Sequence, residues 1–432
     1  MRGPCRASPV RGTIRAFGVK AKAAAIPVLG YFAITGERYA MFRHIIIPGT
    51  QTDLLRRELA AAFAAEGAKV SVVPPAELHD PAGARRLEAL LEDGPAFLFS
   101  VNFQGLSPLR PALELLARAG GAAAVWLVDN PWNILSGVRD PRWKGLPLFV
   151  TDASFIAPLK AHGAAFAHHL PLAASLELFA PEARRDAAFP PPADLAPFVF
   201  VGRSAFPGKE IFFAGQSVAE EALAKARAML ERGERPDLPW WEEETRTAGA
   251  VFWPGKAARR AALGAEEANL FWRASCVREA GRAGADLFGD AGWRDLPGLA
   301  GGVRVFPPVD YYARLPGIYR AARHSLCLTS LQLPAGLNQR HFDVWAAGGV
   351  ALSDATPGLA LFPEELTRPV TFRRAADIVP VAERLAATHR RADLVRDWQG
   401  CLAAGHTYRH RVCAVLEAVA AGRGSGARQT AP

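Results

Sequence analysis

Short apolar runs alternate along most of the chain with longer segments of helical spacing. Each run is short enough for a strand, and the Ala/Leu/Arg-rich segments between them keep their apolar positions three or four residues apart. Several of these segments stop at a glycine, as at Gly67 and Gly163. This alternation predicts an α/β protein whose parallel sheets are covered by helices on both faces.

The predicted elements form two groups, separated by a proline-rich run at 188–197. Four prolines in this run fix φ and cannot donate to a sheet, so we expect a linker between two domains. Before it we predict strands at 45–47, 69–73, 96–101, 123–128 and 148–151, and helices at 54–66, 84–92, 109–119 and 154–162. After it we predict strands at 198–201, 286–288, 303–306, 325–330 and 350–353, and helices at 217–232, 257–283, 316–323 and 338–347.

Further segments precede and follow the two predicted domains. The first predicted strand begins close to Met41, which favours Met41 as the native start and 1–40 as a non-native or disordered extension; a targeting segment is the alternative. The predicted division is 41–187 for the first domain, 188–197 for the linker, 198–373 for the second domain with a helical insertion at about 207–284, 374–421 for C-terminal helices and 422–432 for a disordered tail.

The net charge of +9 first suggests an anionic partner, but the charge is uneven. Residues 1–40 carry seven basic and one acidic residue, which leaves 44 basic and 41 acidic residues for the remainder. A nucleic-acid binder normally shows a basic face in its folded part, so we expect no nucleic-acid partner. A few convergent cations that hold a diphosphate fit this balance better. The five cysteines lack metal-ligand spacing and no apolar run is long enough to span a bilayer, so we expect a cytoplasmic protein without a metal, cofactor or transmembrane segment.

The stretch 316–355 is the most informative part of the chain. Its polar residues Asn338, Gln339, Arg340 and Asp343 gather at the start of a predicted helix that lies between two apolar strands. Ligands of open α/β sheets bind outside the carboxyl ends of strands and at helix N-termini. The layout therefore predicts a phosphate or nucleotide pocket.

Three segments together resemble the CgeB-like (spore maturation protein) branch of GT-B glycosyltransferases, over about residues 41–420. They are the block with Asn338, Arg340, Phe342, Asp343 and Gly348-Gly349, the sequence AVWLVDNPWNIL at 124–135, and FVFVGR at 198–203 with Lys209. The resemblance implies a GT-B fold, in which two doubly wound Rossmann-like domains face a cleft and C-terminal helices cross back onto the first domain. It further implies transfer of a sugar from a nucleotide-sugar donor to an unknown glycan, protein or small-molecule acceptor, without a bound metal.

The resemblance also assigns a diphosphate-binding role to Arg203 and Lys209, which follow the strand 198–201. Gly202 permits close backbone approach there, and two cations stabilise a diphosphate as its charge develops. The spacing between the two cations is one residue longer than usual, and Glu210 replaces the usual glycine after the lysine. Two solvated loop cations are the alternative reading.

Asn338, Arg340 and Asp343 would complete the donor pocket. Asp343 aligns with the second glutamate of the E-x7-E motif, which holds the nucleotide ribose in retaining group-1 enzymes, whereas the first glutamate is replaced by Ala335. An ordinary N-cap for Asn338 and a first-turn acid for Asp343 are the alternatives.

The candidate acceptor side lies at the end of the strand 123–128. Asp129 could act as the general base toward an acceptor hydroxyl, or it could be an Asx-turn residue ahead of Pro131. Asn130 and Trp132 would contact the acceptor, with packing as the alternative for the tryptophan. Two rival functions stay open: a sugar-nucleotide epimerase, and a degenerate protein that binds a nucleotide sugar or a surface-layer partner without turnover.

Overall fold

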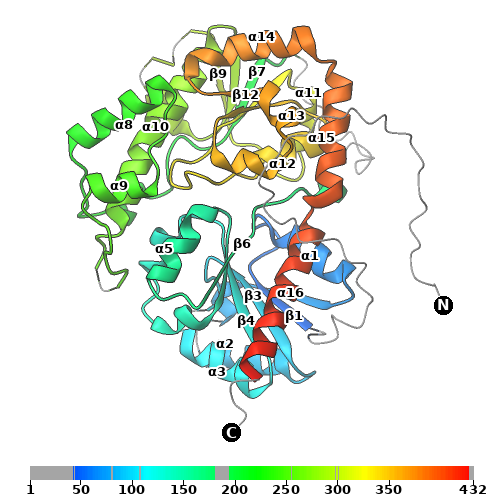
Figure 1. The fold of residues 1–432 in the computed structure, drawn as a ribbon. Helices are drawn as coiled ribbons and strands as arrows, with labels where there is room; N and C mark the ends of the chain where they lie inside the picture. Colours follow the sequence, from blue (N-terminus) through cyan, green and yellow to red (C-terminus); the bar gives the residue numbers. More distant parts are fainter. Residues whose placement is uncertain are drawn as a thin grey trace, which may run out of the picture. The chain divides into compact units, whose positions relative to one another are not determined.

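The computed structural model describes Phe42 and residues 44–78, 81–106, 109–180, 194–253, 255–296, 298–299 and 301–427. These residues belong to one compact unit of the chain (Figure 1). The predicted extension at 1–40 and most of the predicted linker lie outside the described residues, so both stay predictions.

The first sheet has six parallel strands in the order β2-β1-β3-β4-β5-β6. From β1 the chain moves to β2 on one side and then returns to β3 on the other, so the direction of winding switches between β1 and β3. The strands are β1 (His44–Pro48), β2 (Lys69–Val73), β3 (Ala96–Val101), β4 (Ala122–Leu127), β5 (Pro147–Val150) and β6 (Phe166–His169). The helices are α1 (Arg56–Ala65), α2 (Pro81–Leu91), α3 (Leu109–Arg118), α4 (Pro131–Leu135), α5 (Ile156–Ala161) and α6 (Leu176–Phe179).

The second sheet is also parallel, in the order β12-β11-β10-β7-β8-β9. Its switch of direction lies between β7 and β10. The strands are β7 (Phe198–Val201), β8 (Ala285–Phe288), β9 (Val303–Phe306), β10 (His324–Cys327), β11 (Ala351–Asp354) and β12 (Thr371–Phe372). The helices are α7 (Lys209–Phe212), α8 (Glu220–Arg232), α9 (Leu238–Glu244), α10 (Arg259–Gly281), α11 (Leu315–Ala321), α12 (Arg340–Ala346), α13 (Glu364–Thr367), α14 (Ile378–Thr388), α15 (Arg391–Gly405) and α16 (Tyr408–Ala427).

The predicted fold class, two doubly wound Rossmann-like domains, is confirmed. The central strands are mostly apolar because helices cover both faces of each sheet, and β1 and β3 are buried at every position. The predicted insertion at 207–284 contains α7 to α10, and Figure 1 shows α8, α9 and α10 grouped beside the second sheet.

Several element boundaries differ from the sequence-based ones, among them the ends of β10 and α16. β10 ends at Cys327 although the apolar run continues, because the Thr329 amide donates to the Asp354 carboxylate (3.0 Å) instead of to a strand. α16 runs through Ala427 and so takes in residues that were assigned to a tail from 422 on.

The C-terminal helix α16 returns to the first domain. A parallel bridge joins Ala174 to Thr407 just before the helix, and Arg411 donates from Nε to the carbonyl of Pro171 (2.7 Å). Figure 1 shows α16 beside α1. Among the described residues, no helix is both long and apolar enough to cross a membrane.

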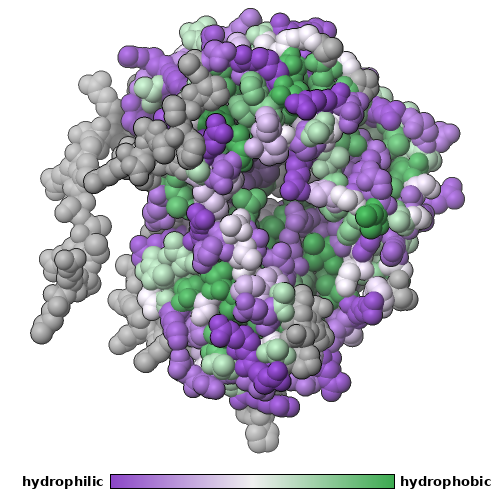
Figure 2. Space-filling view, turned by 180° about the vertical axis from the view of Figure 1, so that it is seen from behind, coloured by the Kyte–Doolittle hydropathy of each residue, from purple (hydrophilic) through white to green (hydrophobic). Residues whose placement is uncertain are grey.

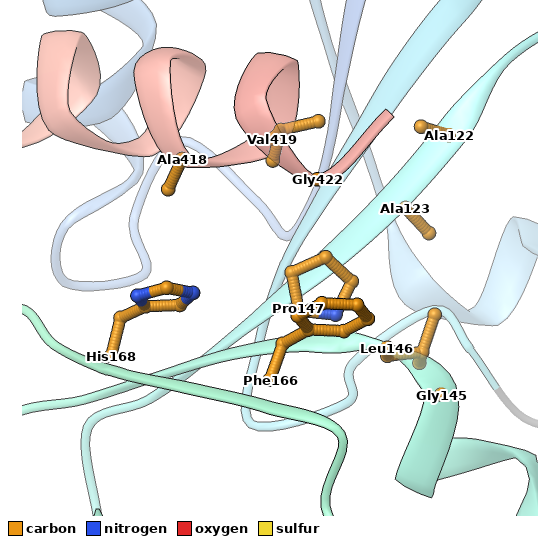
Figure 3. A pocket seen from close by; sticks show the side chains of 10 residues that line it. All are labelled: Ala122, Ala123, Gly145, Leu146, Pro147, Phe166, His168, Ala418, Val419 and Gly422. Carbon is orange, nitrogen blue, oxygen red and sulfur yellow. The ribbon is translucent and has the colours of Figure 1, made fainter. Parts of the chain in front are cut away.

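A cavity of about 220 Å³ lies under the end of α16, against the amino-terminal ends of β4, β5 and β6 (Figure 3). Its lining is mostly small and apolar, and His168 is the only titratable residue among the described residues that form it. Because ligands of such sheets bind at the carboxyl edge, this cavity is not a candidate for the main site.

Candidate functional site

Arg340 lies at the switch point of the second sheet and joins the ends of its two central strands. Its Nη1 donates to the carbonyl of Val201 at the end of β7 (2.9 Å), and its Nη2 donates to the carbonyl of Leu328 just after β10 (3.0 Å). The guanidinium also lies over the ring of Phe200, 5.0 Å from its centroid. A Cβ at Gly202 would come within 3.1 Å of Nη1, so a larger residue would require the guanidinium or its neighbours to shift by a few tenths of an ångström.

Asn338 takes part in the same arrangement. Its Nδ2 donates to the carbonyl of Leu328 (2.6 Å), and its Oδ1 lies 3.0 Å from Nδ1 of His341. The residue before α12 is Gln339 and makes no side-chain cap, so Asn338 acts as a bridge to the β10 loop rather than as an N-cap. The structure therefore brings together Gly202, Asn338 and Arg340.

The two predicted diphosphate cations have different surroundings. Arg203 is exposed, and no hydrogen bond or ion pair of its guanidinium is found within the described part of the chain. Lys209 begins α7, and its Nζ lies 2.6 Å from Oε1 of Glu267 on α10. The charge of Lys209 is thus already balanced, whereas no described residue balances that of Arg203.

A third cation at this edge, Arg273 on α10, went unnoticed in the sequence. Its Nη1 donates to the carbonyl of Arg203 (3.3 Å), while its Nε is buried and has no partner among the described residues. Burial lowers the pKa of the Arg273 guanidinium, an effect that the nearby Glu266 opposes and Arg340 reinforces. No sequence motif marks this position, because it lies inside a long helix of mixed composition.

Asp343 is almost completely buried, with 1% of its surface exposed. Its Oδ2 accepts from the Tyr311 hydroxyl (2.6 Å) and its Oδ1 accepts from Nε2 of Gln339 (2.7 Å). Burial raises the pKa of this carboxyl from 3.8 to about 8, although both hydrogen bonds lower it. Gln339 in turn contacts the carbonyl of Ala173 and the hydroxyl of Tyr408, so Asp343 lies where the chain crosses between the domains. Its predicted role toward a ribose stays a prediction, since both oxygens are engaged by protein groups.

Asp129 follows β4 at the carboxyl edge of the first sheet. Its side chain is exposed, yet burial of its surroundings raises the carboxyl pKa, and a hydrogen bond from Nδ2 of Asn102 to Oδ2 (2.7 Å) opposes the shift. Desolvation therefore outweighs the effect of this hydrogen bond on the carboxyl pKa. The face seen in Figure 2 is hollowed near its middle and is bordered there by hydrophilic and hydrophobic side chains.

Unusual backbone conformations mark this edge. Asn102 and Phe103, directly after β3, have φ of 53° and 61°, and Leu55 before α1 has φ of 73°. Left-handed φ costs energy for residues other than glycine and tends to occur at functional sites. These positions lie by the β1/β3 switch point, a signal that residue types alone did not provide.

Asn130 and Trp132 serve the junction between the domains. Asn130 caps α4 through Oδ1, which accepts from the Trp132 amide (2.8 Å), and its Nδ2 donates to the carbonyl of Gln332 in the second domain (2.8 Å). The Trp132 ring is 2% exposed, and its Nε1 donates to Glu242 on α9 (2.9 Å). As placed, Trp132 packs in the core, so the prediction that it contacts an acceptor is not supported by its burial.

A series of buried hydrogen bonds leads from this junction to the Arg203 loop. Oε1 of Gln332 accepts from Asn133 (2.7 Å), and its Nε2 donates to Oε2 of Glu266 (2.8 Å). Oε1 of Glu266 accepts from the amide of Phe206 (2.7 Å), three residues after Arg203. Hydrogen bonds thus connect the acceptor-side helix α4 to the loop that holds the exposed cation.

The loop after β10 is held by the first domain at a further point. The amide of Ala335 donates to Oδ2 of Asp152 (2.9 Å), and Asp152 also caps the turn at Ser154. Ala335 is the position where the E-x7-E motif has its first glutamate. Here the position contacts protein rather than offering a carboxylate.

Solved structures of low similarity cover most of the chain. An E. coli structure described as trehalose-6-phosphate bound with UDP-2-fluoro glucose is 13% identical over 87% of this chain and 98% of its own, with a TM-score of 0.44. A trehalose 6-phosphate synthase from Burkholderia multivorans is 12% identical over 91% and 99%, with a TM-score of 0.46. HepE from Anabaena in complex with UDP-glucose is 12% identical over 89% and 99%, also at 0.46.

TM-scores below 0.5 are too low to transfer a ligand or an activity to this chain. None of the curated proteins compared with the chain matches it. Residues 259–417, which run from the start of α10 into α16, match a protein family described as glycosyl transferase-like.

Proposed function

We propose that this protein is a glycosyltransferase that moves a sugar from a nucleotide-sugar donor to an acceptor hydroxyl. The observation that carries the proposal is that the glycosyl transferase-like match at 259–417 includes Asn338 and Arg340, which line the β7/β10 switch point beside the exposed cation Arg203. A switch point is where open α/β sheets bind their ligands. The CgeB-like type, a hexose as the transferred sugar, independence from metal and a cytoplasmic location are finer parts of the same proposal.

The donor would be held by the second domain. When the bond between the sugar and the diphosphate breaks, negative charge develops on the diphosphate, and a fixed cation stabilises it without reorganisation. Arg203 is the candidate for this role because its guanidinium has no ion-pair partner among the described residues, and Lys209 is a weaker one because it is paired with Glu267. Gly202, Asn338 and Arg340 shape the strand ends around the site, and Asp343 stays the candidate for the ribose.

Asp129 would act as the base on the acceptor side. A raised pKa makes its carboxylate a better proton acceptor, and Asn102 holds one oxygen in place. Asn130, next to it, fixes the loop to the second domain, which would set the distance between acceptor and donor.

The first experiment is a thermal-shift screen of the protein against UDP-, GDP-, ADP- and CMP-sugars. A ligand that binds only the folded state stabilises it by about 2.7 kcal/mol at a hundredfold excess over its Kd. With the donor found, Arg203→Ala should lose donor binding in calorimetry, whereas Asp129→Asn should keep it and lose about 100-fold or more in transfer rate. Unchanged donor affinity in Arg203→Ala would remove the diphosphate role, and full activity in Asp129→Asn would remove the base.

A protein that binds a nucleotide sugar without turnover is the second candidate. It is favoured by Ala335, which replaces the first glutamate of the motif and whose amide is bound by Asp152. This reading predicts donor binding with no release of free nucleotide on long incubation with candidate acceptors. Nucleotide release coupled to a glycosylated acceptor would exclude it, and release without such a product would favour the epimerase.

A further inference from the structure

We infer that Arg273 provides the second cation of the diphosphate site, beside Arg203 and in place of Lys209. The inference rests on the proposed function and names a binding residue for it. Arg273 lies on α10, within hydrogen-bond distance of the backbone of Arg203, since its Nη1 lies 3.3 Å from that carbonyl. It therefore faces the loop that directly follows β7, at the switch point of the sheet.

The guanidinium of Arg273 has unused donors. An arginine offers five N–H groups, and this one makes a single long hydrogen bond to the described residues, while its Nε is buried without an acceptor among them. No ion pair of Arg273 is found among the residues that the structure describes. A partly buried cation with unsatisfied donors is suited to binding an anion.

The charged groups around Arg273 leave it available. Those that act on it are Glu266, Arg340, Asp354 and Asp290. Each of the three carboxylates already accepts hydrogen bonds from other groups. Glu266 accepts from Phe206 and Gln332, Asp354 from Arg235, Trp272 and Thr329, and Asp290 from Ser204 and Gly292. Arg340 adds positive charge beside the guanidinium groups of Arg273 and Arg203.

Lys209 is less available for the same role. The 2.6 Å ion pair with Glu267 makes the two side chains neutral together, and a phosphate near Nζ would also approach the Glu267 carboxylate. The extra residue between Arg203 and Lys209 and the Glu210 that follows agree with this view. A residue of α10 then takes the place of the first residue of α7 as phosphate ligand.

Inorganic pyrophosphate is the probe, because it tests the phosphate subsite without knowledge of the base. Calorimetry would compare the unaltered full-length protein with Arg273→Gln, with the double variant Lys209→Gln/Glu267→Gln, and with Arg278→Gln. The double variant removes the ion pair without a change in net charge. Arg278→Gln removes one exposed positive charge from the same helix, where it contacts the carbonyl of Gly298.

We expect Arg273→Gln to weaken pyrophosphate binding about 10- to 100-fold, which corresponds to about 1.4 to 2.8 kcal/mol. The double variant and Arg278→Gln should each stay within about threefold of the unaltered protein. A larger loss in the double variant than in Arg273→Gln, or no loss in Arg273→Gln, would overturn the assignment while leaving the donor site in place. Pyrophosphate and nucleotide sugars that both fail to bind the unaltered protein would instead overturn the proposed function itself.

Two further measurements keep the test clear of folding effects. The melting temperature of Arg273→Gln should equal that of the unaltered protein, because only one long hydrogen bond is lost. Arg273→Lys keeps the charge and should recover part of the lost affinity. Equal losses in the lysine and glutamine variants would show that charge at this position does not contribute, which also overturns the assignment.

Discussion

The buried carboxyl of Asp343 gives the sharpest prediction about stability. Its pKa is raised from 3.8 to about 8 in the folded protein, and burial is the main cause. The folded state therefore holds a proton that the unfolded chain releases once the pH exceeds 3.8. Stability falls wherever the unfolded state binds fewer protons than the folded state, so this group should destabilise the protein progressively as pH rises toward 8 and add nothing further above it.

The size of the effect follows from the shift. Each pH unit between the two pKa values corresponds to about 1.4 kcal/mol, so the step from pH 5 to pH 7 should cost about 2.7 kcal/mol from this group alone. In Asp343→Asn the side chain no longer titrates. Its amide can still accept from Gln339 and can donate to the Tyr311 hydroxyl oxygen, so both contacts of the buried carboxyl can be kept.

Denaturant unfolding of both proteins at pH 5, 6, 7 and 8 would measure this. We expect the free energy of unfolding of Asp343→Asn, minus that of the unaltered protein, to increase steadily over the series. Taking the difference cancels the titration of the groups that both proteins share and that do not interact with Asp343. A difference that is constant with pH, or that decreases, would refute the reasoning that Asp343 is neutral in the folded protein.

Two further predictions concern the junction between the domains. The ring centroid of Phe252 lies 5.0 Å from that of Trp132 and 4.7 Å from that of His162. Phe252→Ala should therefore lower the free energy of unfolding by about 3–5 kcal/mol and split one calorimetric unfolding transition into two. A single unshifted transition would contradict this coupling between the domains. Glu266→Gln and Gln332→Glu should each weaken nucleotide-sugar binding. The double variant should restore binding, because exchanging the amide and the carboxylate keeps their buried hydrogen bond and only reverses its direction. If the loss in the double variant equals the sum of the two single losses, this bond does not position the Arg203 loop.

Much of the fold could be predicted from the sequence because parallel strands buried on both faces leave an unmistakable pattern. The bounds of β2, β3, β7 and β9 agree with the predicted ones, since turn-forming or polar residues end each apolar run. β10 was predicted too long because apolar residues continue past its end. The partner that stops it, Asp354, is distant in sequence, and no local pattern reveals such a contact.

The site shows the same division between local and distant information. Local pattern placed Gly202 at a strand end and Asn338 and Arg340 at the start of a helix, and the structure gathers all three at one switch point.

Contacts between separate elements decide which cations near that switch point remain available to bind an anion. Glu267 balances Lys209 from another helix, and α10 brings Arg273 to the Arg203 carbonyl across seventy residues. A motif can therefore predict which strand ends and helix start form a site, whereas the charge left available there is decided by tertiary packing.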